Sequence, residues 1–350
     1  MITLTVGGHS HTSALEDGTL SIRSYGALRS SFRATLHYNE IPEFFPKVGQ
    51  EILLSENGTL LWGGLLVEAE QICHSTESFT MTLRGQGYEH ILQRYCLPGI
   101  ELEEMSPSDA TRYIFNTYLD ESDRLRLGNV EDGLTQKFPY HFYPAKASSV
   151  FDHLAKENGF VWWINENKTF YMRSRLPRVE EALCIDLTGR KPNRLEDVQT
   201  FVYRSSTAEC KNVQYVYNKL TGAEGVSTKP LLISQMASRY GSGQYGSSAI
   251  NSVVTNAEEA ETVAAQMLLA NPGLGEIEFT TDSDAFALGQ VVDVIAPVCG
   301  INREVLFCIT EIRAVYFCNR FRYTIVAKET DADPLSTTAW ENILAKGSTN

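Results

Sequence analysis

The first hundred residues contain several short runs in which hydrophobic and polar positions alternate. In the run at 32–39 every second side chain is apolar, so these side chains share one face of a half-buried strand. Apolar runs at 48–54 and 60–68 follow, with the turn sequence ENG between them, and the run at 79–85 alternates again. Several short strands joined by turns predict a small antiparallel β-barrel or sandwich.

The next segment, residues 98–180, has apolar residues at helical spacing. Ser106 is suited to cap a helix with Pro107 at its first position. The predicted apolar stripe of this helix consists of Ala110, Tyr113, Ile114 and Thr117. A second helix over 148–158 and a hairpin over 160–173 follow. Trp162 and Trp163 of the hairpin could stack on a sugar, but we expect one or both in the core. This segment is therefore predicted to be a small α+β module.

Strand patterns return after residue 196. Alternating runs occupy 198–204 and 212–218, and the stretch 221–255 is rich in Gly and Ser, which predicts a long loop. A capping-box pattern opens a helix at Asn256. Four further strands are predicted at 275–281, 288–296, 304–315 and 321–328.

Two of these strand groups share one order of residues. Gly49-Gln50 and Gly289-Gln290 each precede a strand, a turn and a second strand with an aromatic residue, Trp62 or Phe307. The pattern predicts a mainly β fold in which two similar β-domains flank the α+β module. The expected boundaries are 1–97 for the first β-domain, 98–180 for the module, 181–330 for the second β-domain, and 331–350 for a linker with a short helix.

Composition excludes several classes of function. The chain has 350 residues, which suits two or three domains, and a formal net charge of −13 spread along its length. No basic cluster is visible, so sequence-specific nucleic-acid binding is not expected. No apolar run is long enough to span a bilayer, and the N-terminal stretch lacks the features of a secretory signal. Seven cysteines without a CxxC motif predict small buried side chains in a reducing compartment.

The candidate chemical motifs are weak. The GSGQYG stretch at 241–246 matches a dinucleotide fingerprint in letters, but no strand-helix context surrounds it. His9 and His11 could share a metal on one strand face, although without a third ligand surface histidines are the favoured interpretation. Glu101, Glu103 and Glu104 precede a helix, where acidic residues are favourable without any catalytic role. We therefore expect no catalytic residue, no cofactor and no metal.

Several longer stretches, taken in order, resemble a known family. They are VGQEILL and LLWGGLL with FTMTLRGQGYEHILQRY, then SSVFDHLAKENGFVWWINENKTFYM, then CKNVQYVYN, and finally LGQVVDV with FCITEIRAVYFCNRFRYTIVAKE. Over about residues 20–330 the chain resembles the trimeric baseplate or tail-tip hub proteins of tailed phages and related contractile injection particles. The resemblance implies two tail-tube-like β-barrel domains in each subunit.

The resemblance also implies partners. A homotrimer with six such domains can join a hexameric tail-tube protein to a threefold spike or tip protein, with the tape-measure protein as a further partner. The expected location is the tail of a virion or phage-tail-like particle assembled in the bacterial cytoplasm. The net charge leads us to expect a channel wall with more acidic than basic residues. The alternative function is that of a tail-associated hydrolase of cell walls or carbohydrates, and the end of the chain at Asn350 leaves little room for a lytic domain.

The last twenty residues carry the expected partner-binding side chains. Pro334 interrupts the chain after the final predicted strand, and Thr338 can cap a short helix. Trp340, Ile343 and Leu344 share one face of that helix. So short a helix is not stable alone, so we expect these side chains to dock on a neighbouring subunit or on the spike.

Overall fold

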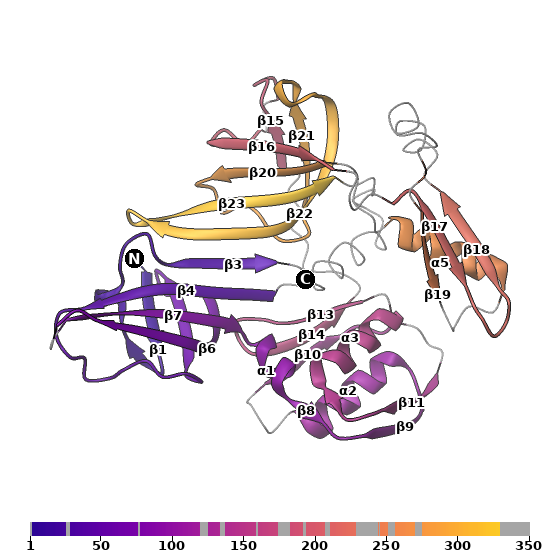
Figure 1. Ribbon diagram of the computed structural model, residues 1–350, viewed down its shortest axis with the longest axis horizontal. Coiled ribbons are helices and arrows are strands. Elements are labelled where there is room, and N and C mark those ends of the chain that lie inside the picture. Colours follow the sequence, from indigo (N-terminus) through magenta and orange to yellow (C-terminus); the bar gives the residue numbers. More distant parts are fainter. Residues whose placement is uncertain are drawn as a thin grey trace. The chain divides into compact units, whose positions relative to one another are not determined.

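The chain forms two compact units in the computed structural model (Figure 1). The structure describes residues 2–25, 29–75, 78–119, 125–133, 137–158, 160–173, 183–191, 194–206, 211–228, 244, 246–250, 256–269 and 275–329. Unit 1 consists of Met1–Pro177, Thr280–Leu288 and Glu311–Ile325, and unit 2 contains the remaining segments. The described strands and small helical insertions confirm a mainly β fold.

Unit 1 begins with an antiparallel sheet. Its elements are β1 (Ile2–Val6), β2 (His9–Ser10), β3 (Ser21–Tyr25), β4 (Arg29–Tyr38), β5 (Glu51–Glu56), β6 (Thr59–Cys73) and β7 (Phe79–Gly87), with a 3-10 turn, η1, at Thr12–Ala14. The strand order is β3-β4-β7-β6-β5-β1-β2, and residues 311–315 of strand β22 (Ile301–Phe317) pair with β3. The predicted strands at 32–39, 48–54, 60–68 and 79–85 are thereby confirmed.

The alternation in these strands corresponds to the two faces of the sheet. Phe32, Ala34 and Leu36 are buried, whereas Arg33 and His37 between them are exposed. The same core includes Ala314, Tyr316 and Phe321 from residues 311–325, which the sequence pattern assigns to the second β-domain. Among the described strands the pairings give an open strand order, with β2 at one end.

The α+β module of unit 1 follows the sequence pattern closely. Its elements are α1 (Glu89–Arg94), β8 (Cys96–Leu97), β9 (Ile100–Met105), α2 (Pro107–Tyr118), β10 (Arg126–Val130), β11 (Phe138–Phe142), β12 (Ala145–Lys146), α3 (Ala147–Asn158), β13 (Val161–Ile164) and β14 (Thr169–Arg173). The Ser106 side chain accepts a hydrogen bond from the Asp109 amide, with Pro107 directly after the cap, so the predicted start of α2 is confirmed. Trp162 and Trp163 are buried, as expected.

The buried stripe of α2 differs from the prediction by one position. Ala110 and Ile114 are buried as expected, but Tyr113 and Thr117 are exposed, and Thr111 and Phe115 are buried instead. Phe115 packs on Phe170 with ring centroids 5.2 Å apart. The stripe is rotated because the large aromatic side chain buries more apolar surface than a tyrosine whose hydroxyl retains water.

The described part of unit 2 contains most of the remaining strands and helix α5. Its elements are β15 (Leu183–Asp186), β16 (Thr200–Ser205), β17 (Val213–Tyr217), β18 (Glu224–Thr228), β19 (Gly246–Ile250), α5 (Ala257–Leu269), β20 (Gly275–Thr281), β21 (Val291–Ala296), η2 (Pro297–Cys299), the first part of β22 and the end of β23 (Arg320–Glu329). The predicted long loop at 221–255 was wrong in two places, because β18 and β19 lie within it and pair with β17. Both strands are short, and each has a single large apolar residue, Val226 or Ile250, so they give little periodic signal.

The repeated Gly-Gln sequence has the same local structure in both places. The Gly49 amide donates to the Leu66 carbonyl, and the Leu66 amide donates to the Gln50 carbonyl, each at 2.8 Å. The Gly289 amide donates to Ile309 at 2.8 Å, and the Ile309 amide donates to Gln290 at 2.9 Å. Both glycines have positive φ, 91° and 81°. The repeat is therefore structural as well as sequential.

These hydrogen bonds also correct one predicted correspondence. They equate Leu66 with Ile309, so the residue equivalent to Phe307 is Gly64. Trp62 lies two residues earlier and pairs with Leu54. The two aromatic residues therefore occupy different register positions. The amino-acid sequence alone does not show this difference.

The tightest packing in the module surrounds Phe170. Its ring centroid lies 4.8 Å from that of Phe151 and 5.8 Å from that of Trp162. We expect Phe170→Ala to lower the free energy of unfolding by about 3–5 kcal/mol, because it leaves a cavity among rigid rings. Chemical denaturation measures this change. Tyr143→Ala is the control, since Tyr143 is 87% exposed and should shift stability by less than about 0.5 kcal/mol. Equal losses in the two variants would contradict the proposed core.

Candidate interaction surfaces

The residues expected to bind partners, Trp340, Ile343 and Leu344, lie outside the described residues. The same holds for most of the GSGQYG stretch, of which Gln244 and Gly246 are described. The candidate surfaces described below are strand edges, sheet faces and pockets of the two units.

One free strand edge lies in unit 1. β5 pairs with β6 from Thr59 to Leu65, and β7 pairs with β6 from Gly64 to Cys73. Within the described part of the chain, no strand pairs with the other side of β6 beyond Leu65. The segment 67–73, VEAEQIC, is largely exposed and includes two glutamates. Backbone groups along such an edge can pair with another strand.

Unit 2 has a second free edge. β16 lies at the end of the described strand order, next to β20, and its exposed and half-exposed residues alternate. Arg204 on this strand forms ion pairs with Glu276 at 3.4 Å and Glu278 at 3.0 Å. Each unit therefore presents an edge that another chain could extend.

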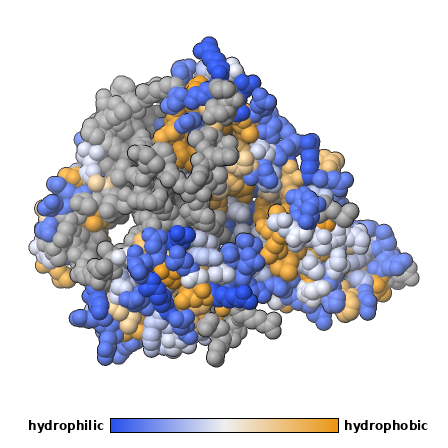
Figure 2. Space-filling view, turned by 180° about the vertical axis from the view of Figure 1, so that it is seen from behind, coloured by the Kyte–Doolittle hydropathy of each residue, from blue (hydrophilic) through white to orange (hydrophobic). Residues whose placement is uncertain are grey.

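The small sheet of unit 2 has one open face. Helix α5 packs against β17 and β18, where Val216 and Ala260 are buried. Tyr215 lies opposite Val226 in the register, and Tyr217 lies opposite Ile250. Tyr215, Val226 and Ile250 are exposed. Figure 2 shows more generally that hydrophobic residues lie among hydrophilic ones on the described surface.

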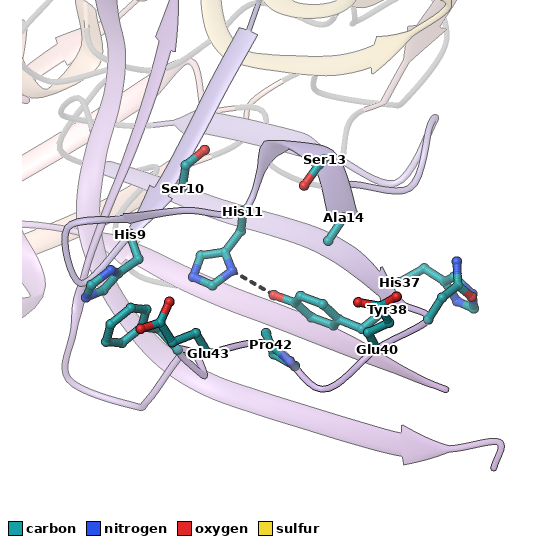
Figure 3. Close-up of a pocket in the computed structure, with 12 residues that line it drawn as sticks. His9, Ser10, His11, Ser13, Ala14, His37, Tyr38, Glu40, Pro42 and Glu43 are labelled. Carbon is teal, nitrogen blue, oxygen red and sulfur yellow. Dashed lines mark hydrogen bonds between the residues drawn. The ribbon is translucent and has the colours of Figure 1, made fainter. Parts of the chain in front are cut away.

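A pocket of about 520 Å³ lies beside the edge strand β2 (Figure 3). The ring of His9 stacks on Phe44, with centroids 3.6 Å apart. His11 is 5% exposed, and its Nδ1 lies 2.7 Å from the hydroxyl of Tyr38. Glu40 and Glu43 also line the pocket.

His11 and Tyr38 form a buried hydrogen-bonded pair. Burial raises the pKa of Tyr38 to about 12, so the phenol keeps its proton, and its hydroxyl shares a hydrogen bond with His11 Nδ1. His11 Nε2 is buried and has no hydrogen-bond partner in the described structure. Burial, and secondarily the charge of His9, lowers the pKa of His11. The pair is thus built around a neutral histidine.

These positions correct the expectations for histidine and cysteine. His11 is a buried core residue and not a surface histidine, and the described residues contain no group of three or more ligands that could hold a metal. Cys184 and Cys308 are buried as expected, whereas Cys73, Cys96 and Cys318 are exposed. Cys318 lies in a turn with positive φ. The apolar residues around it in the sequence predicted a strand instead.

One buried carboxyl has a strongly altered acidity, and it is not among the predicted acidic residues. Burial raises the pKa of Glu89 to about 7, against the opposing effect of the Ser30 amide, which donates to Glu89 Oε1 at 3.0 Å. Glu101, Glu103 and Glu104 are exposed on β9 instead. Glu89 sits in the first turn of α1 and joins that helix to β4.

The charged side chains on the open face of the unit 1 sheet were missed from sequence. Arg23, Arg33, Arg84 and Arg313 come from β3, β4, β7 and β22, and register brings them together on one face. Arg23 and Arg84 are the only charged residues of their strands, Arg33 lies four residues after Arg29, and Arg313 lies two residues after Glu311, so the sequence shows no basic cluster. Only correct strand pairing could have found this group.

Comparison with solved structures finds close similarity of fold. The 43 kDa tail protein of prophage MuSo2 from Shewanella oneidensis superposes with a TM-score of 0.70 at 14% identity, over 95% of this chain and 98% of that one. The prophage tail protein gp18 from Listeria monocytogenes EGD-e gives 0.64 at 12% identity, over 99% and 98%. This chain has the fold of phage tail proteins.

A third match extends the likeness to a secretion system. The E. coli c3393 protein, described as a type VI secretion system component similar in structure to the T4 tail proteins gp27 and gp5, gives a TM-score of 0.55 at 10% identity, over 95% of this chain and 77% of that one. No protein-family model and no curated protein sequence matches the chain. Among the described helices, none has the length and apolarity to cross a membrane.

The buried histidine generates a pH prediction. In the unfolded chain His11 takes up a proton near pH 6.5, whereas its folded pKa is lower. Stability from this residue is therefore fully present above about pH 6.5 and is lost as the pH falls below it. We expect His11→Asn to show a smaller loss of unfolding free energy between pH 7 and pH 5 than the wild type.

Urea unfolding at several pH values measures this slope. His37→Asn is the matched control, because His37 lines the same pocket but is exposed. The control should keep the wild-type slope. A wild-type slope in His11→Asn would show that His11 is not held neutral.

Proposed function

We propose that the chain is a structural hub subunit of a phage tail tip or baseplate. It assembles as a homotrimer, joins the hexameric tail-tube protein to a threefold spike or tip protein, and surrounds part of the central channel. The shared fold with phage tail proteins supports a structural tail role. The observation that carries the trimer is the repeated glycine turn, which gives each subunit two β-units of similar construction.

Symmetry explains why a repeat favours this role. Three subunits with two similar β-units each present six similar surfaces, and these can match a hexameric tube. In this proposal the two units contribute tube-like barrel domains that are completed by neighbouring subunits. The module at 98–180 is an addition to this ring. The location is accordingly the tail of a virion or phage-tail-like particle.

The free strand edges supply a physical means of ring closure. The β6 edge from 67 to 73 carries Glu68 and Glu70, and the β16 edge carries Arg204. Pairing β16 of one subunit with β6 of the next would satisfy both rows of backbone groups and bring opposite charges together. Because the two edges differ, this contact is head-to-tail. Three subunits joined by it form a closed ring.

We further propose that the subunit is not an enzyme. Glu89, the buried carboxyl with the raised pKa, has a structural partner in the Ser30 amide, and its helix packs in the core of the α+β module. A particle-bound hydrolase remains the alternative, and turnover of cell-wall material by the purified protein, abolished by a single Glu→Gln change, would establish it.

The assembly is tested by mass and by edge substitutions. Native mass spectrometry should give three times the subunit mass of 39.1 kDa. Val202→Pro and Tyr203→Pro are made separately, because neighbouring amides of a strand point to opposite sides, so one of the two points away from β20. That variant should keep the secondary structure of the wild type in circular dichroism and lose the trimer.

The outcomes are distinct. A wild-type protein that stays monomeric at high concentration and in the presence of tail tubes would refute the hub. Trimers in both folded proline variants would refute the edge pairing while leaving the hub intact. Val226→Pro, on the separate small sheet, is the control for proline in an exposed strand and should retain the trimer.

The terminal segment 331–350 is proposed to dock on a neighbouring subunit or on the spike. The double change Trp340→Ala with Leu344→Ala should leave the melting of the subunit unchanged and weaken particle assembly. Sedimentation of reconstituted tails together with thermal melting checks both. A variant that loses core stability yet assembles normally would show that these side chains pack on their own subunit.

A further inference from the structure

A cleft of about 340 Å³ opens on the charged face of the unit 1 sheet, and Val67 and Glu68 of the β6 edge line one side of it. Its polar lining consists of Ser21, Arg23, Ser31, Arg33, Glu68, Arg84 and Gln86. The register places Arg33 directly opposite Arg84 on one side and opposite Ser21 on the other. Arg23 lies opposite Ser31, which in turn lies opposite Gln86.

The arginines differ in how fully they are paired. Arg23 binds Glu311 through two hydrogen bonds, 2.6 Å from Nε to Oε1 and 3.0 Å from Nη2 to Oε2. Arg313 shares the same carboxylate. Arg84 reaches Glu68 at 3.4 Å. The exposed side chain of Arg33 makes no ion pair or hydrogen bond in the part of the chain that the structure describes. With Glu70 on the neighbouring strand, four arginines face three glutamates, so this face is locally positive on a chain of net charge −13.

Two like charges directly opposite each other on adjacent strands destabilise a sheet. Arg33 and Arg84 have this arrangement, and small serines beside them leave room above the backbone. An anion placed between the two guanidinium groups would remove the repulsion and accept hydrogen bonds from both. The geometry therefore suits an oxyanion.

We propose that this face contacts the phosphodiester backbone of nucleic acid without reading its sequence. Arg, Ser and Gln side chains are groups that contact backbone phosphates, and together with Glu68 they make up the polar lining of the cleft. A protein partner is less suited, because the described lining of the cleft offers no exposed aromatic anchor: Phe32 at its base is buried. Glu68 and Glu70 flank the arginines and limit the affinity for phosphate, so the surface can release nucleic acid readily.

The test measures binding of a fluorescent 20-base-pair duplex of mixed sequence by anisotropy between 50 and 200 mM salt. Wild type should bind, with a dissociation constant that rises steeply with salt because counterions are released. Arg33→Gln should lower the magnitude of the salt slope by about 0.9, and the double change Arg33→Gln with Arg84→Gln by about 1.8. Arg33→Lys should restore most of the slope, since it keeps the charge.

The control is Arg126→Gln, which removes an exposed arginine on β10, away from the cleft. It should leave the slope unchanged. Failure of the wild type to bind the duplex at 50 mM salt, or an equal effect of the Arg33 and Arg126 changes, would overturn the proposal.

Two competitors distinguish the source of the oxyanion. Poly-L-glutamate that displaces the duplex at equal charge concentration would assign the face to acidic proteins and overturn the nucleic-acid proposal. Inorganic phosphate that competes at low millimolar concentration would assign it to a free phosphate group and overturn it as well. Neither competition test requires the trimer, so a failure of the nucleic-acid proposal leaves the hub proposal unaffected.

Discussion

A glycine with positive φ, held by two backbone hydrogen bonds to the second strand of its hairpin, sets the geometry of both β-units. At Gly49 a Cβ atom would meet no atom within 4 Å, so the requirement is conformational and not steric. Left-handed backbone at this point strains any residue with a side chain. It turns the chain into the hairpin and aligns Gln50 with Leu66, and with this register the faces of the sheet are determined. The same device at Gly289 sets β21 against β22.

The predictability of each element follows the strength of its local signal. The strand at 32–39 and the start of α2 could be predicted because alternation and a Ser-Pro cap are properties of neighbouring residues. β18 and β19 were missed because five-residue strands with one large apolar residue each have no apolar period. The correspondence of Trp62 with Phe307 was wrong because register depends on pairing across the sheet, which spacing along the chain does not contain.

The candidate surfaces depend even more on contacts across the fold, which the local sequence does not contain. His11 alternates like a surface residue, yet its burial depends on the tyrosine that reaches it from β4. The arginines of the charged face are spread over residues 23–313 and become neighbours only through three strand pairings. An overall charge of −13 says nothing about such a group, since local fields depend on where charges gather and not on their sum. An acidic channel wall was expected from that sum, and this face would not contribute to one.

The order in which the chain supplies unit 1 has a consequence for its biosynthesis. Strand β3 pairs with residues 311–315, and the core of the same unit takes in Tyr316 and Phe321. A nascent chain that has emerged only as far as Pro177 therefore exposes one long edge of β3 and an unfilled apolar face. Multidomain chains usually fold their N-terminal domain while the rest is still being made. Here the sheet and core of the N-terminal unit can be completed only after residues 311–321 have been made, near the end of translation.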